Sequence, residues 1–107
     1  MSCYMIVQAE LTDRARFAEY AARTPKVVQA YGGSYVCLGR GAQLLEGSFG
    51  EGQSVVISVW PSREAALTFW NSPEYAELKK LREGTGSFNV SLVDDLSAVI
   101  AASASGT

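Results

Sequence analysis

Six side chains of the sequence combine aromatic, charged and hydrogen-bonding groups that could recognise a small organic molecule: Tyr31, Arg40, Glu46, Trp70, Asn71 and Tyr75. A tyrosine hydroxyl can donate a hydrogen bond to a carbonyl or enolate oxygen, and it can act as an acid or base when its pKa falls. Arg40 and Glu46 stand in an otherwise apolar stretch and could pair within a pocket. Each residue also has an ordinary structural use, as a core ring, a surface or interface ion pair, or a helix cap. Any chemistry therefore depends on whether the fold brings these side chains together.

The chain has no histidine and only two cysteines, Cys3 and Cys37. The missing histidine excludes Ser–His and Cys–His nucleophile pairs, histidine-ligated haem and the common zinc sites. Two distant thiols are too few for a metal site, so we expect neither a metal nor a cofactor. Both cysteines lie in apolar, strand-like segments, which favours buried free thiols over a disulfide.

The composition is that of one small globular domain. The 107 residues are 48% hydrophobic and 19% charged, with a formal net charge of −2. We expect a domain over residues 1–96 and an Ala/Ser-rich tail over 97–107, either a frayed helix or disordered. The chain contains no basic run, which argues against binding to nucleic acid or anionic membranes. The apolar runs are too short to span a membrane and the N-terminal segment has no signal-peptide pattern, so we predict a cytoplasmic protein.

The pattern of apolar residues, caps and turns predicts an α+β fold with the order βαββαβ. We expect strands over 4–11, 34–46, 54–60 and 88–93, with a bulge or bend at 39–41 and a turn at 47–52. The first helix is capped by Thr12 or Asp13, is interrupted at Thr24-Pro25 and ends at Gly32-Gly33. The second helix is capped by Ser62. This order is that of a ferredoxin-like domain with a four-stranded antiparallel sheet.

The second helix contains a break at Asn71-Ser72-Pro73. Proline disfavours helix at the preceding residue and fits the first turn of a new helix, and serine is a good N-cap. The break could simply bend the helix around a small sheet. Alternatively, it could open a cleft between the helices and the sheet, lined by Trp70, Asn71 and Tyr75.

Both faces of the predicted sheet are apolar. In the first strand Met5 and Val7 alternate with Tyr4 and Ile6, and in the third strand Val55, Ile57 and Val59 alternate with Val56 and Trp60. We group Val56 and Trp60 with Tyr4 and Ile6, together with a few polar residues, namely Gln8, Glu10 and Ser58. A soluble monomer avoids a large contiguous apolar patch, so we predict that a second copy covers this face in a homodimer.

The chain from Tyr4 to about Asp94 resembles the DUF1330 family. The matching segments are EYAARTPKVVQAYGGSY, LLEGSF, VVISVWPSREAALTFWNSPEYAELKKLRE and SLVD. This resemblance implies a dimeric α+β barrel, in which two ferredoxin-like subunits place their sheets face to face. It implies little about activity, because the function of the family is unknown.

One departure from the family pattern concerns an Arg-Gly-Gly triplet that members often carry in the second strand. Leu38 occupies the arginine position here, and Arg40 falls on the second glycine. The strand period places both residues on one face, roughly 7 Å apart, so Arg40 could replace the missing charge. The third strand and following helix also resemble haem-degrading and antibiotic-biosynthesis monooxygenases. The haem-ligating histidine of the former is absent from the matching segment AELKKLRE.

Three functions are compatible with these features. The first is a small-molecule-binding protein or cofactor-free enzyme acting on a small organic substrate, resembling a monooxygenase or isomerase. The second is a ligand-binding or sensing module without turnover, and the third is a dimeric accessory protein. Polar groups converging in a closed pocket would favour the first, an apolar pocket the second, and the absence of a pocket the third.

Overall fold

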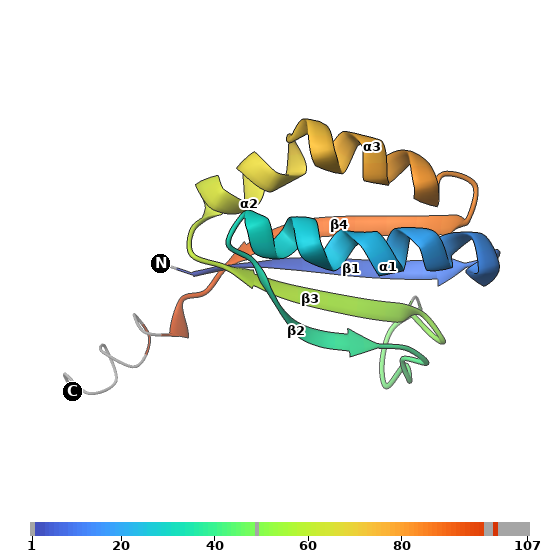
Figure 1. Cartoon of the computed structure of the whole chain (residues 1–107). Helices are drawn as coiled ribbons and strands as arrows, with labels where there is room; N and C mark the ends of the chain where they lie inside the picture. The colour runs from blue at the N-terminus through green and yellow to red at the C-terminus, as the bar shows by residue number, and fades with distance from the viewer. Residues whose placement is uncertain (1, 49, 98–99, 101–107) are drawn as a thin grey trace.

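The computed structural model describes residues 2–48, 50–97 and 100. The elements follow the order β1 (Cys3–Leu11), α1 (Arg14–Ala30), β2 (Ser34–Gly39), β3 (Ser54–Trp60), α2 (Arg63–Trp70), α3 (Pro73–Arg82) and β4 (Gly86–Asp94). All three helices cover one face of the sheet, and no helix or strand of the described residues covers the other face (Figure 1). The predicted ferredoxin-like α+β fold is confirmed. Most of the predicted tail over 97–107 lies outside the described residues.

The sheet has the strand order β2-β3-β1-β4, and all neighbouring strands are antiparallel. β1 pairs with β4 from Cys3↔Asp94 to Leu11↔Gly86 and with β3 on its other side. β2 is shorter than the sequence predicts, because it ends at Gly39 rather than near residue 46. Gly41 follows with a positive φ of 72°, a conformation that turns the chain out of the strand. The irregularity in β2 lies between Tyr35 and Cys37, and not at the glycines of 39–41.

Local capping explains where the helices begin and end. The Asp13 side chain accepts a hydrogen bond from the Arg16 N–H at 3.0 Å, and the Ser62 hydroxyl accepts one from the Ala65 N–H at 3.1 Å. At the end of α1, Gly32 adopts a φ of 93°. Its N–H donates to the Gln29 carbonyl and the next N–H donates to the Val28 carbonyl, which is the Schellman arrangement.

The predicted interruption of the first helix at Thr24-Pro25 is wrong. α1 runs without a break from Arg14 to Ala30, with Pro25 inside it. Proline removes one hydrogen bond, the one to the carbonyl four residues earlier, while the Thr24 hydroxyl donates to the Tyr20 carbonyl at 2.6 Å. Thr24 and Val28 are both buried against the sheet. Packing of this turn therefore offsets the lost hydrogen bond.

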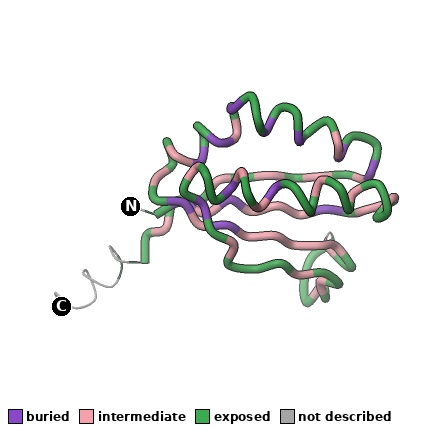
Figure 2. Tube along the Cα trace, in the orientation of Figure 1, coloured by how far each residue is buried: buried purple, intermediate pink, exposed green. Residues whose placement is uncertain are grey.

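The core lies between the helices and the sheet, where buried residues gather on the inner side of each helix (Figure 2). Trp60 and Phe69 are 1% and 2% exposed, and their ring centroids are 4.9 Å apart. The Trp60 indole N–H donates to the Ser58 hydroxyl at 2.9 Å, which satisfies its only donor. The remaining buried apolar members of this cluster are Met5, Val28, Ala66, Tyr75 and Leu78.

The pairing register corrects the predicted faces of β3. Met5 pairs with Ser58 and Val7 with Val56, so these residues lie on one face of the sheet. That face meets the helices, because Met5 belongs to the core cluster. Ser58, Val56 and Trp60 therefore lie under the helices. The outer face instead carries the apolar residues Tyr4, Ile6, Val55, Ile57, Val59 and Val93, together with Cys37. The outer face is therefore more apolar than we expected when we grouped Val56, Trp60 and Ser58 with Tyr4 and Ile6.

Cys3 and Cys37 are both free, as predicted. β3 lies between their strands, which places the two thiols beyond disulfide reach. Cys3 is buried, but the prediction that Cys37 is also buried is wrong. Cys37 pairs with Ile57 and so occupies the outer face of an edge strand, where no element covers it.

Among the described residues, no helix combines the length and apolarity that a membrane crossing requires.

Candidate functional site

A cavity of about 540 Å³ lies between the helices and the inner face of the sheet. Residues from all four strands and all three helices line it. Its floor is largely apolar and includes Met5, Val7 and Val90. Ala21, Leu38 and Arg40 also line the cavity and are exposed, so its opening lies between α1 and the end of β2. The volume is within the range of small-molecule sites.

A pair of tyrosine hydroxyls lies in the wall of this cavity. The Tyr20 and Tyr75 hydroxyl oxygens are 2.9 Å apart and share a hydrogen bond. Burial, reinforced by the neighbouring Tyr75, raises the pKa of Tyr20 above its usual value. Burial also raises the pKa of Tyr35, and the Tyr75 hydroxyl adds to that rise. The Tyr20 and Tyr35 phenols are therefore protonated at neutral pH, where they can donate hydrogen bonds.

The Ser72-Pro73 break sets the position of Tyr75. Ser72 is the N-cap of α3 in an extended conformation, and its hydroxyl accepts from the Tyr75 N–H at 3.1 Å. The same hydroxyl donates to the Phe69 carbonyl at 2.7 Å, which ties the end of α2 to the start of α3. Tyr75 then packs against the rings of Phe69 and Trp70, with centroid distances of 4.6 and 5.1 Å. The break both bends the helical segment and places two aromatic rings on the cavity.

Arg82 is a cavity residue that the sequence interpretation missed. It is the last residue of α3 and is only 8% exposed. Its guanidinium carbon lies 4.4 Å from the centre of the Phe88 ring, and its Nε is buried without a hydrogen-bond partner among the described residues. The helical spacing of Tyr75, Leu78 and Arg82 could have revealed it, since an arginine there continues the buried stripe of the helix.

Of the six residues singled out in the sequence, the fold brings Arg40, Trp70 and Tyr75 to the cavity. The other three do not line it. The Tyr31 hydroxyl donates to the Glu74 carboxylate, and Asn71 is the exposed C-cap of α2. Glu46 is exposed in the segment between β2 and β3.

Leu38 and Arg40, which the strand period was expected to place on one face, both line the cavity. Arg40 follows the end of β2 and is exposed, while Leu38 is 72% exposed. The guanidinium therefore stands at the opening of the cavity and not at its floor. Within the described part of the chain, no ion pair joins Arg40 to Glu46.

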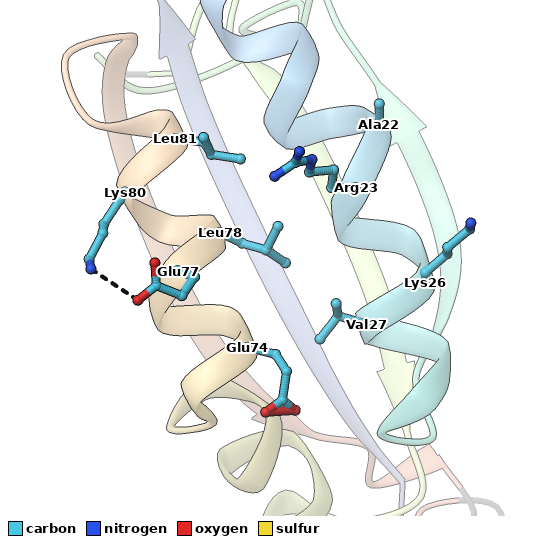
Figure 3. A pocket seen from close by; sticks show the side chains of 9 residues that line it. All are labelled: Ala22, Arg23, Lys26, Val27, Glu74, Glu77, Leu78, Lys80 and Leu81. Carbon is cyan, nitrogen blue, oxygen red and sulfur yellow. Dashed lines mark hydrogen bonds and ion pairs between the residues drawn. The ribbon is translucent and has the colours of Figure 1, made fainter.

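A second depression lies between α1 and α3 on the outer side of the helices (Figure 3). Its base consists of Val27, Leu78 and Leu81, and its rim carries basic and acidic side chains, including the Lys80–Glu77 ion pair at 3.0 Å. Such a groove between two amphipathic helices is a normal result of helix packing. Its charges are of both signs and exposed, so the interior cavity is the better candidate site.

The described residues contain no cluster of three or more histidine, cysteine, aspartate or glutamate side chains that could hold a metal ion. The polar groups that line the cavity are phenols, guanidinium groups, and the hydroxyls of serine and threonine.

Replacing Tyr75 with phenylalanine should lower the free energy of unfolding by about 1–3 kcal/mol, because the buried Tyr20 hydroxyl loses its partner. Thermal or urea denaturation measures the change. The matched control is Tyr31→Phe, whose hydroxyl bonds to Glu74 at the exposed surface and should cost less than about 0.5 kcal/mol. An equally small effect for Tyr75→Phe would mean that solvent in the cavity satisfies Tyr20.

Three solved structures are similar to the fold. A protein of unknown function from Rhodopseudomonas palustris, RPA0582, aligns with a TM-score of 0.76 at 21% identity, covering 90% of this chain and 83% of that one. A dimeric ferredoxin-like protein of unknown function from Jannaschia sp. CCS1 has a TM-score of 0.67 at 10% identity, covering 89% of this chain and 100% of that one. SnoaB, a cofactor-independent oxygenase from Streptomyces nogalater, has a TM-score of 0.64 at 17% identity, with coverages of 88% and 92%. At these identities the similarity shows the fold alone.

A comparison with curated proteins finds no match. The model of the DUF1330 family, described as a domain of unknown function, matches residues 2–96. This range contains the whole sheet, all three helices and every residue that lines the cavity. The chain belongs to the DUF1330 family.

Proposed function

We propose that the protein binds a small organic molecule in the cavity between its helices and its sheet. The observation that supports this proposal most strongly is a largely apolar cavity of about 540 Å³ whose lining includes several polar side chains. Apolar walls with a few placed donors are typical of small-molecule sites. Trp70 and Tyr75 supply aromatic surface, and the hydroxyls of Tyr20, Tyr35 and Tyr75 supply hydrogen bonds.

A cofactor-free enzyme is the second candidate. It is favoured by the phenol donors, which can stabilise negative charge on a carbonyl or enolate oxygen. The fold similarity to SnoaB, a cofactor-independent oxygenase, supports the same candidate at the level of the fold. However, among the described residues no aspartate, glutamate, lysine or histidine lines the cavity, and the pKa values of Tyr20 and Tyr35 are raised. The cavity thus provides donors but no base, which makes binding the better supported function.

The active unit is, in this proposal, a homodimer whose subunits pack through the outer faces of their sheets. That face carries Tyr4, Ile6, Val55, Ile57 and Val59, and in the described part of the chain no helix or strand covers it (Figure 1). A similar protein from Jannaschia is described as dimeric. Sedimentation at micromolar concentration should give about twice the chain mass of 11.5 kDa. The cytoplasmic location stays a prediction from the sequence.

Binding in the cavity can be tested with N-phenylnaphthylamine, a neutral apolar dye whose fluorescence rises on transfer out of water. Ala21 is an exposed helical residue at the opening of the cavity, so Ala21→Trp should block entry while leaving the helix intact. We expect the dye to bind the wild type and to bind Ala21→Trp at least about tenfold more weakly, a change of about 1.4 kcal/mol.

The matched control is Ala18→Trp, an exposed position on the same helix that does not line the cavity. This variant should bind the dye as the wild type does. No binding to the wild type, or equal binding to both tryptophan variants, would contradict the proposal.

A further inference from the structure

We infer that the ligand of this cavity is an organic anion, with an apolar body held by the cavity walls and one anionic group held by Arg82. This inference rests on the proposed function, since it names the chemical class of the molecule that the cavity binds. It follows from three observations on the described residues.

The first observation is a buried cation without an anion. Arg82 is 92% buried, given its exposure of 8%, and the three ion pairs among the described residues all involve other side chains. Its Nε lies buried without an acceptor. Contact with the Phe88 ring accounts for the position of the guanidinium plane but supplies no hydrogen-bond acceptor in the plane of the group. Buried charges in proteins are normally paired and hydrogen-bonded, so we expect Arg82 to bind an anionic group of the ligand.

The second observation is the sign of the charge around the cavity. Three charged residues line it, Arg14, Arg40 and Arg82, and all are basic. The protein as a whole has more acidic than basic residues, 11 against 9. The basic lining therefore does not follow from the composition. A cavity lined by charges of one sign favours a ligand of the opposite sign, most strongly where water is excluded.

The third observation is the arrangement of donors beside the cation. Arg82 lies near enough to Tyr20 that its positive charge opposes the rise in the pKa of that hydroxyl. Tyr20 in turn is hydrogen-bonded to Tyr75. Arg82, Tyr20 and Tyr75 all line the same cavity, so a guanidinium and two phenols can offer several donors to one oxyanion there. Arginine is suited to planar groups such as carboxylates. The aromatic and aliphatic walls then contact the apolar body of the ligand.

The contribution of the ligand charge can be measured with two dyes that share one ring system. N-phenylnaphthylamine is neutral, and anilinonaphthalene sulfonate has the same ring system with an added anionic group. We expect the sulfonate to bind the wild type about 10- to 100-fold more tightly than the neutral dye, as a charge-assisted contact predicts. Equal affinities, or tighter binding of the neutral dye, would overturn the inference. Failure of both dyes to bind would instead contradict the proposed function.

The role of Arg82 in binding the anionic group can be tested with Arg82→Met. This substitution keeps an unbranched side chain over Phe88 and removes the positive charge. The sulfonate should bind this variant no more tightly than the neutral dye, whose affinity should stay within about twofold of wild type. Arg23→Met, an exposed α1 arginine outside the cavity, should keep the full preference. A preserved preference in Arg82→Met would overturn the role of Arg82. If Arg82→Met fails to fold, the inference is tested by displacing the neutral dye from the wild-type protein. Decanoate, which is anionic, should displace the dye at a concentration at least about tenfold lower than decanol, which is neutral. Equal displacement by the two would overturn the inference.

Discussion

Gly86→Ala is expected to lower the free energy of unfolding by about 3 kcal/mol or more. Gly86 begins β4 and pairs with Leu11 at the end of β1. A Cβ added there would lie 2.2 Å from the Glu10 carbonyl oxygen and 2.9 Å from the Leu11 Cα. Both contacts are with backbone, so no side-chain rotation can relieve them.

The surrounding hydrogen bonds make a backbone shift costly as well. The N–H groups of Thr12 and Asp13 both donate to the Thr85 carbonyl, at 2.8 and 3.1 Å. Moving Gly86 away from β1 would strain these bonds next to the N-cap of α1. Urea denaturation measures the loss of stability.

Gly39→Ala is the matched control. A Cβ at Gly39 would meet only the Cys37 sulfur at 3.4 Å and the Val55 carbonyl oxygen at 3.6 Å, which are ordinary contacts. Its effect should stay within about 1 kcal/mol, since alanine also restricts the unfolded chain. Equal effects of the two substitutions would contradict the close approach of β1 and β4.

Ile57→Glu is expected to convert the proposed homodimer into a folded monomer. Ile57 lies on the outer face, in a central strand, and pairs with Ile6. A carboxylate at this position would be buried without a partner in each subunit of the dimer. An uncompensated buried charge costs about 3–5 kcal/mol, which is more than a hundredfold in Kd.

The monomer itself should tolerate the substitution, because the outer face then meets water. Sedimentation should therefore give one chain mass, 11.5 kDa, with a circular dichroism spectrum like that of the wild type. Leu67→Glu, on an α2 residue that is 40% exposed, places the same side chain away from the sheet and should leave the dimer intact. An unchanged mass for Ile57→Glu would show that the subunits do not associate through this face.

Short-range signals made most of the fold predictable. The caps at Asp13 and Ser62 and the glycine pair at Gly32 act through contacts within a few residues, so the sequence alone reveals them. Thr24-Pro25 and Ser72-Pro73 show the limit of such signals. The two pairs look alike, yet α1 continues through the first, where Thr24 is buried against the sheet. Whether such a pair breaks a helix depends on packing between distant segments.

The candidate site was less predictable, because its residues are far apart in the sequence. They come together only when the strands pair and the helices pack on the sheet. Tyr75 and Trp70 are close in sequence to the visible break, and the sequence draws attention to them. Tyr20 contacts Tyr75 across 55 residues, and nothing local to either residue indicates the contact. Arg82 was missed for a different reason, since charged residues on a helix are normally expected to face solvent.

The strand order also determines when the chain can fold during its synthesis. β1 is a central strand and is made first, but neither of its neighbours exists until much later. β3 begins at Ser54, and β4 is complete only at Asp94. A nascent chain therefore carries β1 unpaired until β3 is complete at Trp60, and one edge of β1 stays unpaired until β4 has been made. The sheet then forms late and through contacts between distant segments, which is slow compared with helix formation and leaves β1 open to association with other nascent chains.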